Sequence, residues 1–217
     1  MEKLTLKEVN YPGKLIVFEG TDGAGKTTMI SKLVEYLSNK YGSNNVLSIK
    51  QPTDMSRKTK LFQKMMYSES HDDIDYRAVQ LLTMSDRIQH IHEVIEPALK
   101  EGKYIVCDRY VYTSYVNMLA RGYDNEAWFI NVVKNIIKPN VVFLAYVDPS
   151  LAIKRIKSRV VEANRFLDEK LLINVSNNFI KLAKIENFKV LDTSVDSNLA
   201  FNEVLKTLKE VGVINEI

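Results

Sequence analysis

The sequence predicts an α/β fold in which a mostly parallel β-sheet is covered by helices on both faces. Two observations support this prediction: five short apolar runs have the length of strands, and amphipathic segments with helical periodicity lie between them. Strands that alternate with helices form parallel sheets, because each right-handed crossover brings the chain back to the same edge. The carboxyl ends of the strands then meet at one edge, where we expect a ligand to bind.

Each predicted element has its own pattern. The predicted strands are the apolar runs at 15–19, 46–50, 104–108, 141–147 and 189–192. The first predicted helix, 26–40, places Met29, Ile30, Leu33 and Leu37 on one face. The same periodicity predicts further helices at 55–67, 75–100, 111–121, 124–137, 149–159, 168–185 and 197–213.

The composition is that of a globular protein, and we expect one domain over residues 1–217. Hydrophobic residues make up 46% of the chain and charged residues 26%, which is ordinary for such a domain. The net charge of +3 is too small to indicate nucleic acid as a partner. The single cysteine, Cys107, lies in an apolar run, so we expect a buried, inert thiol and no disulfide framework.

The sequence carries no targeting or membrane signal. The first ten residues include acidic side chains and lack the apolar centre of a signal peptide. No apolar run approaches the roughly 18 residues of a membrane helix. We therefore expect a cytoplasmic protein that has no membrane partner.

The most informative motif is a complete phosphate-binding loop, G-x-x-x-x-G-K-[ST]. It follows the first predicted strand and opens the first predicted helix, which is the context in which this pattern binds phosphate. Loop amides and the helix N-terminus attract anions, Lys26 would reach the β- and γ-phosphates, and Thr27 would bind Mg²⁺. The alternative is a chance glycine-rich turn. The residues expected to bind ATP here are Gly20, Thr21, Asp22, Gly23, Ala24, Gly25, Lys26, Thr27 and Thr28.

Asp108 and Arg109 end the third predicted strand, at the same edge as the loop. A carboxylate here can hold the Mg²⁺ shell or accept a proton, and an arginine can pair with a phosphate through two nitrogens. Arg87, in the predicted helix 75–100, is a further candidate, because a buried arginine needs an anionic partner or ligand. Surface ion pairs are the structural alternative in both places. The catalytic candidates are therefore Lys26, Asp108 and Arg109, and the metal candidates are Thr27 and Asp108.

Arginines also gather where the predicted helix 149–159 gives way to the next one. Arg155, Arg159 and Arg165 lie within a few turns of one another. Phosphoryl transfer spreads negative charge over the equatorial oxygens, and an arginine from the same chain can stabilise that charge. The stretch near 155–168 therefore suits a mobile lid, with a solvated helix face as the alternative.

Three stretches together resemble the thymidylate kinase family, a group of phosphate-loop nucleoside monophosphate kinases. They are Phe18-Glu19-Gly20-Thr21-Asp22-Gly23-Ala24-Gly25-Lys26-Thr27-Thr28, Leu81-Leu82-Thr83-Met84-Ser85-Asp86-Arg87 and Asp108-Arg109-Tyr110-Val111-Tyr112-Thr113-Ser114. The stretch 164–168 resembles the family's lid more loosely. The resemblance implies the three-layer P-loop NTPase fold with five parallel strands. It also implies Mg²⁺-dependent transfer of the ATP γ-phosphoryl group to dTMP, giving dTDP.

The resemblance implies roles for single residues at the acceptor. Asp22 matches an acid that faces the 3′-hydroxyl of the acceptor, and Arg109 matches the arginine that grips its phosphate. Arg87 matches an arginine that meets the acceptor nucleotide. The residues expected to bind the acceptor are Asp22, Arg87, Arg109, Tyr110, Ser114 and Asn117.

The resemblance also concerns the donor side. One branch of the family has an arginine in the loop where this chain has Ala24. As in the other branch, the transition-state arginine is expected in the lid, as Arg159 or Arg165. Thr193 lies where the family's adenine-side loop is found, so we expect it to contribute to ATP binding.

The chain departs from the family pattern at the acceptor base. Thr83 replaces a Phe that stacks on thymine in many members, and Asn117 replaces a Tyr or Phe near the deoxyribose. The stretch 50–53 replaces the usual Arg-Glu-Pro-Gly. Phe62, Tyr67 or Tyr112 is expected to help hold the base instead.

These departures keep other functions open. A kinase of another or of several nucleoside monophosphates, or of deoxynucleosides, is one alternative, and an ATP-binding module without catalysis is another. A GTP-driven switch would carry an Asn-Lys-x-Asp motif, which the sequence lacks. The partners expected are ATP and dTMP, and the resemblance suggests a homodimer. The apolar face of helix 75–100 could form its interface, and packing into the core is the equally good alternative for that face.

Overall fold

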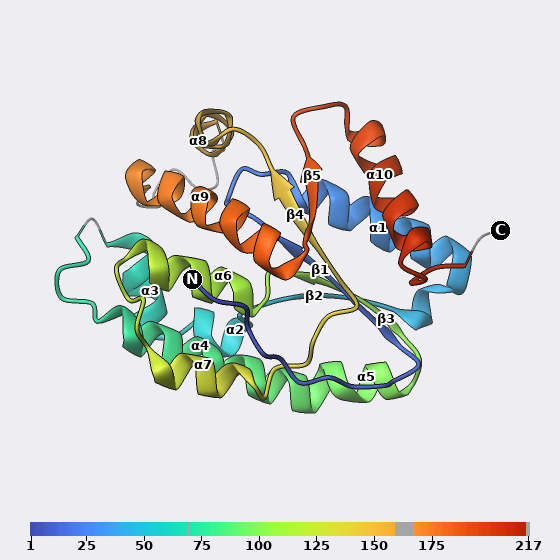
Figure 1. The fold of residues 1–217 in the computed structure, drawn as a ribbon, viewed down its shortest axis with the longest axis horizontal. Helices are drawn as coiled ribbons and strands as arrows, with labels where there is room; N and C mark the ends of the chain where they lie inside the picture. Colours follow the sequence, from blue (N-terminus) through green and yellow to red (C-terminus); the bar gives the residue numbers. More distant parts are fainter. Residues whose placement is uncertain (69, 159–166, 216–217) are drawn as a thin grey trace.

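The central sheet of the protein is parallel and has the five strands that the sequence predicts. The structure, a computed structural model, describes residues 1–68, 70–158 and 167–215. Within these residues the strand order is β2-β3-β1-β4-β5. Figure 1 shows the strands running side by side through the centre of the molecule. Their bounds are β1 (Lys14–Glu19), β2 (Val46–Lys50), β3 (Tyr104–Asp108), β4 (Val141–Tyr146) and β5 (Lys189–Asp192).

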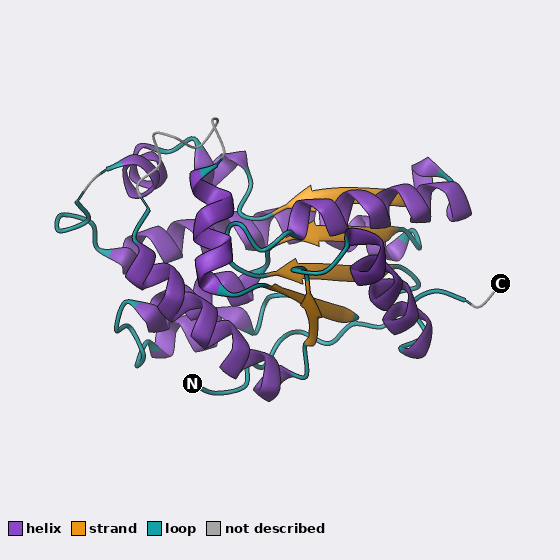
Figure 2. Ribbon diagram, turned by 90° about the horizontal axis from the view of Figure 1, so that it is seen from above, coloured by secondary structure: helices purple, strands orange, loops and turns teal. Residues whose placement is uncertain are grey.

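Helices lie on both sides of the sheet, as the alternation predicted (Figures 1 and 2). None of the helices in the described ranges is long and apolar enough to cross a membrane. Their bounds are α1 (Lys26–Tyr41), η1 (Ser43–Asn45), α2 (Asp54–Arg57), α3 (Lys60–Tyr67), α4 (Tyr76–His90), η2 (Ile91–Ile95), α5 (Glu96–Lys100), α6 (Val111–Ala120), α7 (Ala127–Val133), α8 (Pro149–Lys157), α9 (Glu169–Glu186) and α10 (Ser197–Glu210).

Three predicted helices differ in detail from the structure. The predicted helix 124–137 is the shorter α7, Ala127–Val133. The predicted helix 55–67 is two helices, because the Thr59 side chain accepts a hydrogen bond from the backbone N–H of Phe62 and starts α3 anew. The predicted helix 75–100 comprises α4, the π-helical segment η2 and α5. The break between α2 and α3 matters, because both elements lie near the candidate site.

The two faces of the sheet bury separate cores. On β1, Ile16 and Phe18 point into a core shared with α1 and α10. Leu15 and Val17 point into a larger core shared with α4 to α7 and α9. Successive residues of a strand point to opposite faces of the sheet. Because both faces of β1 are covered, its sequence is a continuous apolar run.

The register of the sheet places two predicted motifs at one edge. β1 lies between β3 and β4, and Phe18 pairs with Asp108 and with Phe143. The phosphate loop leaves β1 one residue after Glu19, beside the end of β3. The acid–arginine pair and the loop therefore meet at the carboxyl edge of the sheet, as predicted.

The first thirteen residues, to which the sequence assigned no role, pack against the larger core. Leu4 and Leu6 are buried. The backbone of Lys7 exchanges hydrogen bonds with the 136–138 segment, donating to Ile136 O (2.8 Å) and accepting from Lys138 N (2.9 Å). Figure 1 shows this dark-blue segment running along the α5 side before it enters β1.

Candidate active site

The phosphate loop is packed closely against β4 and α8. Gly20 and Gly23 both have positive φ angles, of 137° and 78°. A Cβ atom at either position would come within 2.4 Å of a carbonyl oxygen, of Ala145 or of Ala152. Only glycine fits here, because the conformation and the close backbone approach both exclude a side chain.

Lys26 is folded over its own loop. Its ammonium group donates to the carbonyl oxygens of Gly20 (3.0 Å) and Thr21 (2.8 Å). The side chain is 7% exposed. Burial, and then the nearby charge of Arg109, lower its pKa to about 8. The ammonium group is thus held at the loop by carbonyl groups that phosphate oxygens could replace.

Arg109 joins the end of β3 to the phosphate loop. Its φ angle of 66° lies in the left-handed region, and its backbone N–H donates to Phe18 O (2.9 Å). The guanidinium group donates to Gly20 O (3.0 Å) and forms an ion pair with Asp22. Burial opposes its charge, but neighbouring carboxylates, chiefly that of Asp22, raise its pKa above the ordinary value. The loop and Arg109 therefore belong to one cleft, as the sequence predicts.

Glu19 is a site residue that sequence reasoning missed. Its fully buried carboxylate accepts hydrogen bonds from the backbone N–H groups of Tyr110 (2.9 Å) and Thr113 (3.1 Å), and from the Thr113 hydroxyl. Burial raises its pKa, while the hydrogen bonds from Thr113 act in the opposite direction. Glu19 thus anchors the N-terminus of α6 to β1. A carboxylate at the end of a buried strand was the available signal.

The residues predicted to hold Mg²⁺ fit that ion. Asp108 has one oxygen 3.6 Å from the Lys50 ammonium group, while its buried Oδ1 finds no hydrogen-bond partner among the residues that the structure describes. Thr27 is exposed in the first turn of α1. The described part of the chain brings together no group of three His, Cys, Asp or Glu residues. Mg²⁺ typically takes only one or two carboxylates and completes its shell with water and substrate phosphates.

A cavity of about 470 Å³ opens beside the loop. Side chains from α3, α4, α6 and the start of α9 line it, together with Asp22 and Arg109. This volume is within the range of small-molecule sites. Of the residues predicted at the acceptor, those that line it are Asp22, Arg87, Arg109, Ser114 and Asn117; Thr83, Phe62 and Tyr67 line it as well.

Asp86 and Arg87, adjacent in α4, serve different purposes. Arg87 is 1% exposed and donates to the carbonyl oxygens of Thr83 (3.1 Å) and Tyr110 (3.2 Å). Its Nε is buried without a partner among the described residues, and burial lowers its pKa. An arginine with an unused donor beside the cavity is suited to a ligand oxygen. Asp86 instead accepts backbone N–H groups from the 53–56 segment.

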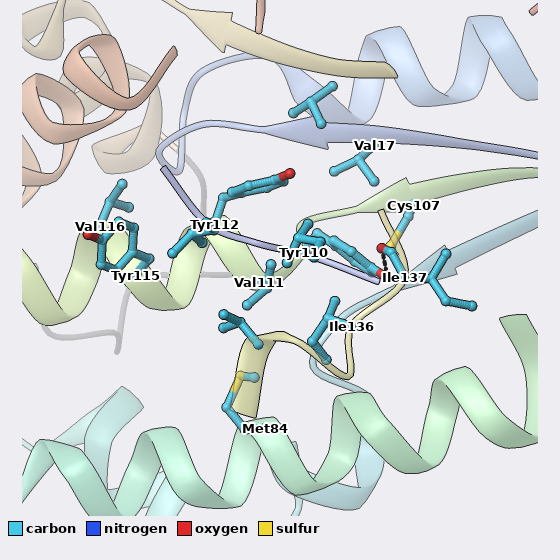
Figure 3. Close-up of a cluster of buried hydrophobic side chains, with 14 of the residues drawn as sticks. Val17, Met84, Cys107, Tyr110, Val111, Tyr112, Tyr115, Val116, Ile136 and Ile137 are labelled. Carbon is cyan, nitrogen blue, oxygen red and sulfur yellow. Dashed lines mark hydrogen bonds between the residues drawn. The ribbon is translucent and has the colours of Figure 1, made fainter. Parts of the chain in front are cut away.

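Two predicted tyrosines do not reach the cavity. Tyr110, predicted at the acceptor, is fully buried, and its hydroxyl donates to Ile137 O (2.9 Å). Tyr112, predicted near the base, packs edge-on against Phe188 at a centroid distance of 4.7 Å. Figure 3 shows both rings among apolar side chains. Both predictions were wrong as to the side chains, because these positions face the core; Tyr110 contributes its carbonyl group to Arg87.

Thr193 and Arg155 brace the loop from the other side. The Thr193 hydroxyl donates to Ala24 O (2.7 Å), and its side chain lies against Gly25. The Arg155 guanidinium group donates to the carbonyl oxygens of Gly23 (3.3 Å) and Thr193 (3.1 Å). Both residues therefore contact the loop, one from α8 and the other from directly after β5. Arg159 and Arg165, the two predicted lid arginines, fall outside the described residues.

Comparisons with known proteins show which family the chain resembles in sequence and fold. The sequence profile of the family described as thymidylate kinase matches residues 18–204. A probable thymidylate kinase of Pyrococcus horikoshii is 38% identical over 178 residues, covering 80% of this chain and 84% of that protein. A thymidylate kinase of Brachyspira hyodysenteriae is 30% identical over 203 residues, covering 93% and 96%. The crystal structure of thymidylate kinase from Ehrlichia chaffeensis has a TM-score of 0.65 and 25% identity, covering 91% and 100%.

Proposed function

The chain belongs to the thymidylate kinase family, and we propose how its residues share the transfer of the ATP γ-phosphoryl group to dTMP, giving dTDP. One observation carries the proposal. Arg109 contacts the phosphate loop twice, at the Gly20 carbonyl oxygen and at the Asp22 carboxylate, and it also lines the 470 Å³ cavity. A donor on the loop and an acceptor in the cavity would therefore place their phosphates on either side of one guanidinium group.

On the donor side, the loop amides and Lys26 hold the β- and γ-phosphates of ATP. The triphosphate takes the place of the loop carbonyl groups that now bind the Lys26 ammonium group. Thr27 and Asp108 would hold Mg²⁺, which would neutralise charge on the phosphate oxygens. The buried Oδ1 of Asp108, which has no hydrogen-bond partner among the residues that the structure describes, supports this assignment.

On the acceptor side, Arg109 orients the phosphate of dTMP, and Asp22 faces the sugar. An oxygen of that phosphate attacks the γ-phosphorus, the bond from this phosphorus to the β–γ bridging oxygen breaks, and ADP leaves. The attacking phosphate is already ionised near neutral pH, so that no strong base is needed and positioning dominates the catalysis. Arg87, whose Nε has no partner within the described part of the chain, supplies a hydrogen bond to the acceptor nucleotide.

Two parts of the proposal rest on the family resemblance. An arginine in the lid near 155–168, Arg159 or Arg165, stabilises charge on the transferring group. A homodimer forms through the outer face of α4, where Leu81 and Ile88 are exposed at 53% and 38%. These two side chains are seven residues apart and so share one helix face.

The test is an assay of purified protein with ATP, Mg²⁺ and each nucleoside monophosphate and deoxynucleoside in turn. We expect ADP formation with dTMP, and a loss of roughly 100-fold or more in kcat/KM for Lys26→Ala and for Arg109→Ala. Arg77→Ala, in an exposed arginine, is the matched control. Near-normal turnover in either site variant, with the fold intact by circular dichroism, would contradict the roles assigned here.

A second acceptor class is favoured by one observation. Thr83 and Asn117, which replace aromatic residues of many family members, both line the cavity. They leave room for monophosphates other than dTMP. The same panel decides between the two: dTMP preferred over the other acceptors supports the narrower function, and equal kcat/KM values for several bases support the broader one.

A further inference from the structure

We propose that Arg121 supplies the surface on which the acceptor base stacks. The proposal rests on the proposed function, because it takes the 470 Å³ cavity to be the acceptor site. Arg121 directly follows α6 and lines that cavity with Asn117, Tyr76 and Gln80. Arg121 is not among the acceptor residues predicted from the sequence.

The Arg121 guanidinium group is held in a fixed plane. Its carbon atom lies 3.9 Å from the centre of the Tyr76 ring, which is stacking distance. Its Nη1 donates to the Asn117 side-chain oxygen (2.8 Å) and to the Asn117 carbonyl oxygen (3.3 Å). Asn117 is oriented in turn by its amide group, which donates to Thr113 O (2.9 Å). Tyr76 thus covers one face of the guanidinium group, and because Arg121 lines the cavity, a planar ligand bound there would stack on the opposite face.

The other candidate stacking surfaces of the cavity are less suitable. Besides Tyr76, the aromatic rings in its described lining are those of Phe62, Tyr67 and His71. Tyr67 is 54% exposed. Arg57 forms a similar pair with Phe62, but its guanidinium carbon lies 5.5 Å from the centre of that ring. This pair is therefore more loosely stacked than Arg121 and Tyr76. A base stacked on Arg121 would lie in a row of ring, cation and ring, and each ring attracts the cation between them.

The distance from the phosphate end of the cavity to Arg121 matches the length of a mononucleotide. Thr113, whose hydroxyl accepts from Arg109 (3.2 Å), is near the phosphate end of the cavity. Arg121 is eight residues further along, or about 12 Å at the rise of an α-helix. A phosphate held at Arg109 therefore leaves the base near Arg121, and the side chain of Asn117 lies one turn before it.

The test uses Arg121→Ala and Arg121→Lys, the second of which keeps the charge and removes the plane. Arg77→Ala is the matched control, because Arg77 also lies over a tyrosine ring, that of Tyr123 at 5.8 Å, but outside the cavity. We measure kcat and KM for dTMP and for ATP, and titrate dTMP into each variant by calorimetry.

We expect Arg121→Ala to raise KM and Kd for dTMP by about 5- to 150-fold, the range of base–aromatic stacks, with KM for ATP within twofold of wild type. Arg121→Lys should resemble Arg121→Ala, and Arg77→Ala should resemble wild type. An unchanged dTMP affinity in Arg121→Ala, or wild-type affinity in Arg121→Lys, overturns the proposal. Should Arg121→Ala fail to fold, Arg121→Lys still decides. A wild-type protein that binds dTMP but does not phosphorylate it would overturn the proposed function alone.

Discussion

At the scale of single residues, the buried charge of Lys26 favours phosphate binding but lowers the stability of the free protein. The unfolded chain holds this lysine at its ordinary pKa of 10.5, whereas burial lowers the pKa in the folded protein to about 8. At neutral pH the folded protein therefore carries a charge that its surroundings disfavour. An active site tolerates such a cost because the same charge attracts the donor phosphates.

We predict that Lys26→Met stabilises the free protein while abolishing ATP binding. At pH 7 the free energy of unfolding, measured by urea denaturation, should rise by about 1–3 kcal/mol, since a shift of one pKa unit corresponds to about 1.4 kcal/mol and the two hydrogen bonds to the loop are lost. Lys206→Met, in an exposed lysine of α10, is the control and should change stability little.

Because of the same pKa difference, the gain in free energy of unfolding that Lys26→Met brings should depend on pH. Between pH 8 and 10.5 the unfolded wild-type chain holds a proton at Lys26 that the folded protein has released. Wild-type stability from this group therefore rises with pH across that window. The difference between Lys26→Met and wild type should shrink from pH 7 to pH 9.5, and a difference that grows instead would show the pKa to be raised by folding.

The sequence predicted single site residues where the chemistry of the residue type itself indicates its role. The loop from Gly20 to Lys26 and Arg109 were found because glycine, lysine and arginine bind phosphate through their own geometry. Tyr110 and Tyr112 were misplaced, since the direction of a side chain at the start of α6 depends on how the helix packs on the sheet. Glu19 was missed for a similar reason: its partners are 91 and 94 residues away in the sequence.

At the scale of elements, Asp86 connects α4 to the short helix α2. Its carboxylate accepts hydrogen bonds from the backbone N–H of Thr53 (3.0 Å), the Thr53 hydroxyl (3.0 Å) and the backbone N–H of Ser56 (2.9 Å). The side chain thereby satisfies donors at the N-terminus of α2 that the helix itself leaves unpaired. Since α3 follows α2 and lines the cavity, Asp86 also fixes one wall of the acceptor site.

We predict that Asp86→Ala lowers the free energy of unfolding by about 2–4 kcal/mol, because it leaves buried donors without an acceptor. KM for dTMP should rise severalfold as α3 loses its support, and KM for ATP should stay near the wild-type value. Asp124→Ala, in an exposed aspartate, should be within about 0.5 kcal/mol of wild type. A loss below 1 kcal/mol in Asp86→Ala would mean that α2 holds its position without this carboxylate.

The periodicity of the sequence located these elements better than it located their ends. It joined α2 and α3 into one helix, because the apolar spacing continues across the break and only the Thr59 cap interrupts it. The strands were located to within a residue, since each is an apolar run between polar turns. Helix ends depend on capping side chains that contribute little to a periodic pattern.

At the scale of the whole molecule, the order of the strands creates the site. β1 lies between β3 and β4, so the loop after β1 touches the residues that follow both neighbours. Arg109 approaches the loop from the end of β3, and Ala145 presses on Gly20 from β4. The sequence predicted that these motifs share an edge, but the strand order that makes them neighbours rests on packing between distant segments.

The N-terminal segment is the part of the molecule that the sequence explained least, and it gives the last prediction. Leu4 is 4% exposed in the larger core, and its backbone N–H donates to Glu186 at the end of α9. The segment thus ties α9 to the side of the sheet that carries α6 and α7. Its contacts lie away from the loop and the cavity, and so it should serve stability rather than chemistry.

We predict that Leu4→Ala lowers the free energy of unfolding by about 2–4 kcal/mol, the usual cost of a buried leucine, and lowers Tm by several degrees. The values of kcat and KM at a temperature well below Tm should stay within twofold of wild type. Leu199→Ala, at a leucine that is 61% exposed, is the matched control and should leave Tm nearly unchanged. Equal effects of the two substitutions would show that the segment is not part of the core. A large loss of kcat in Leu4→Ala, with Tm preserved, would instead mean that this segment reaches the active site through α9.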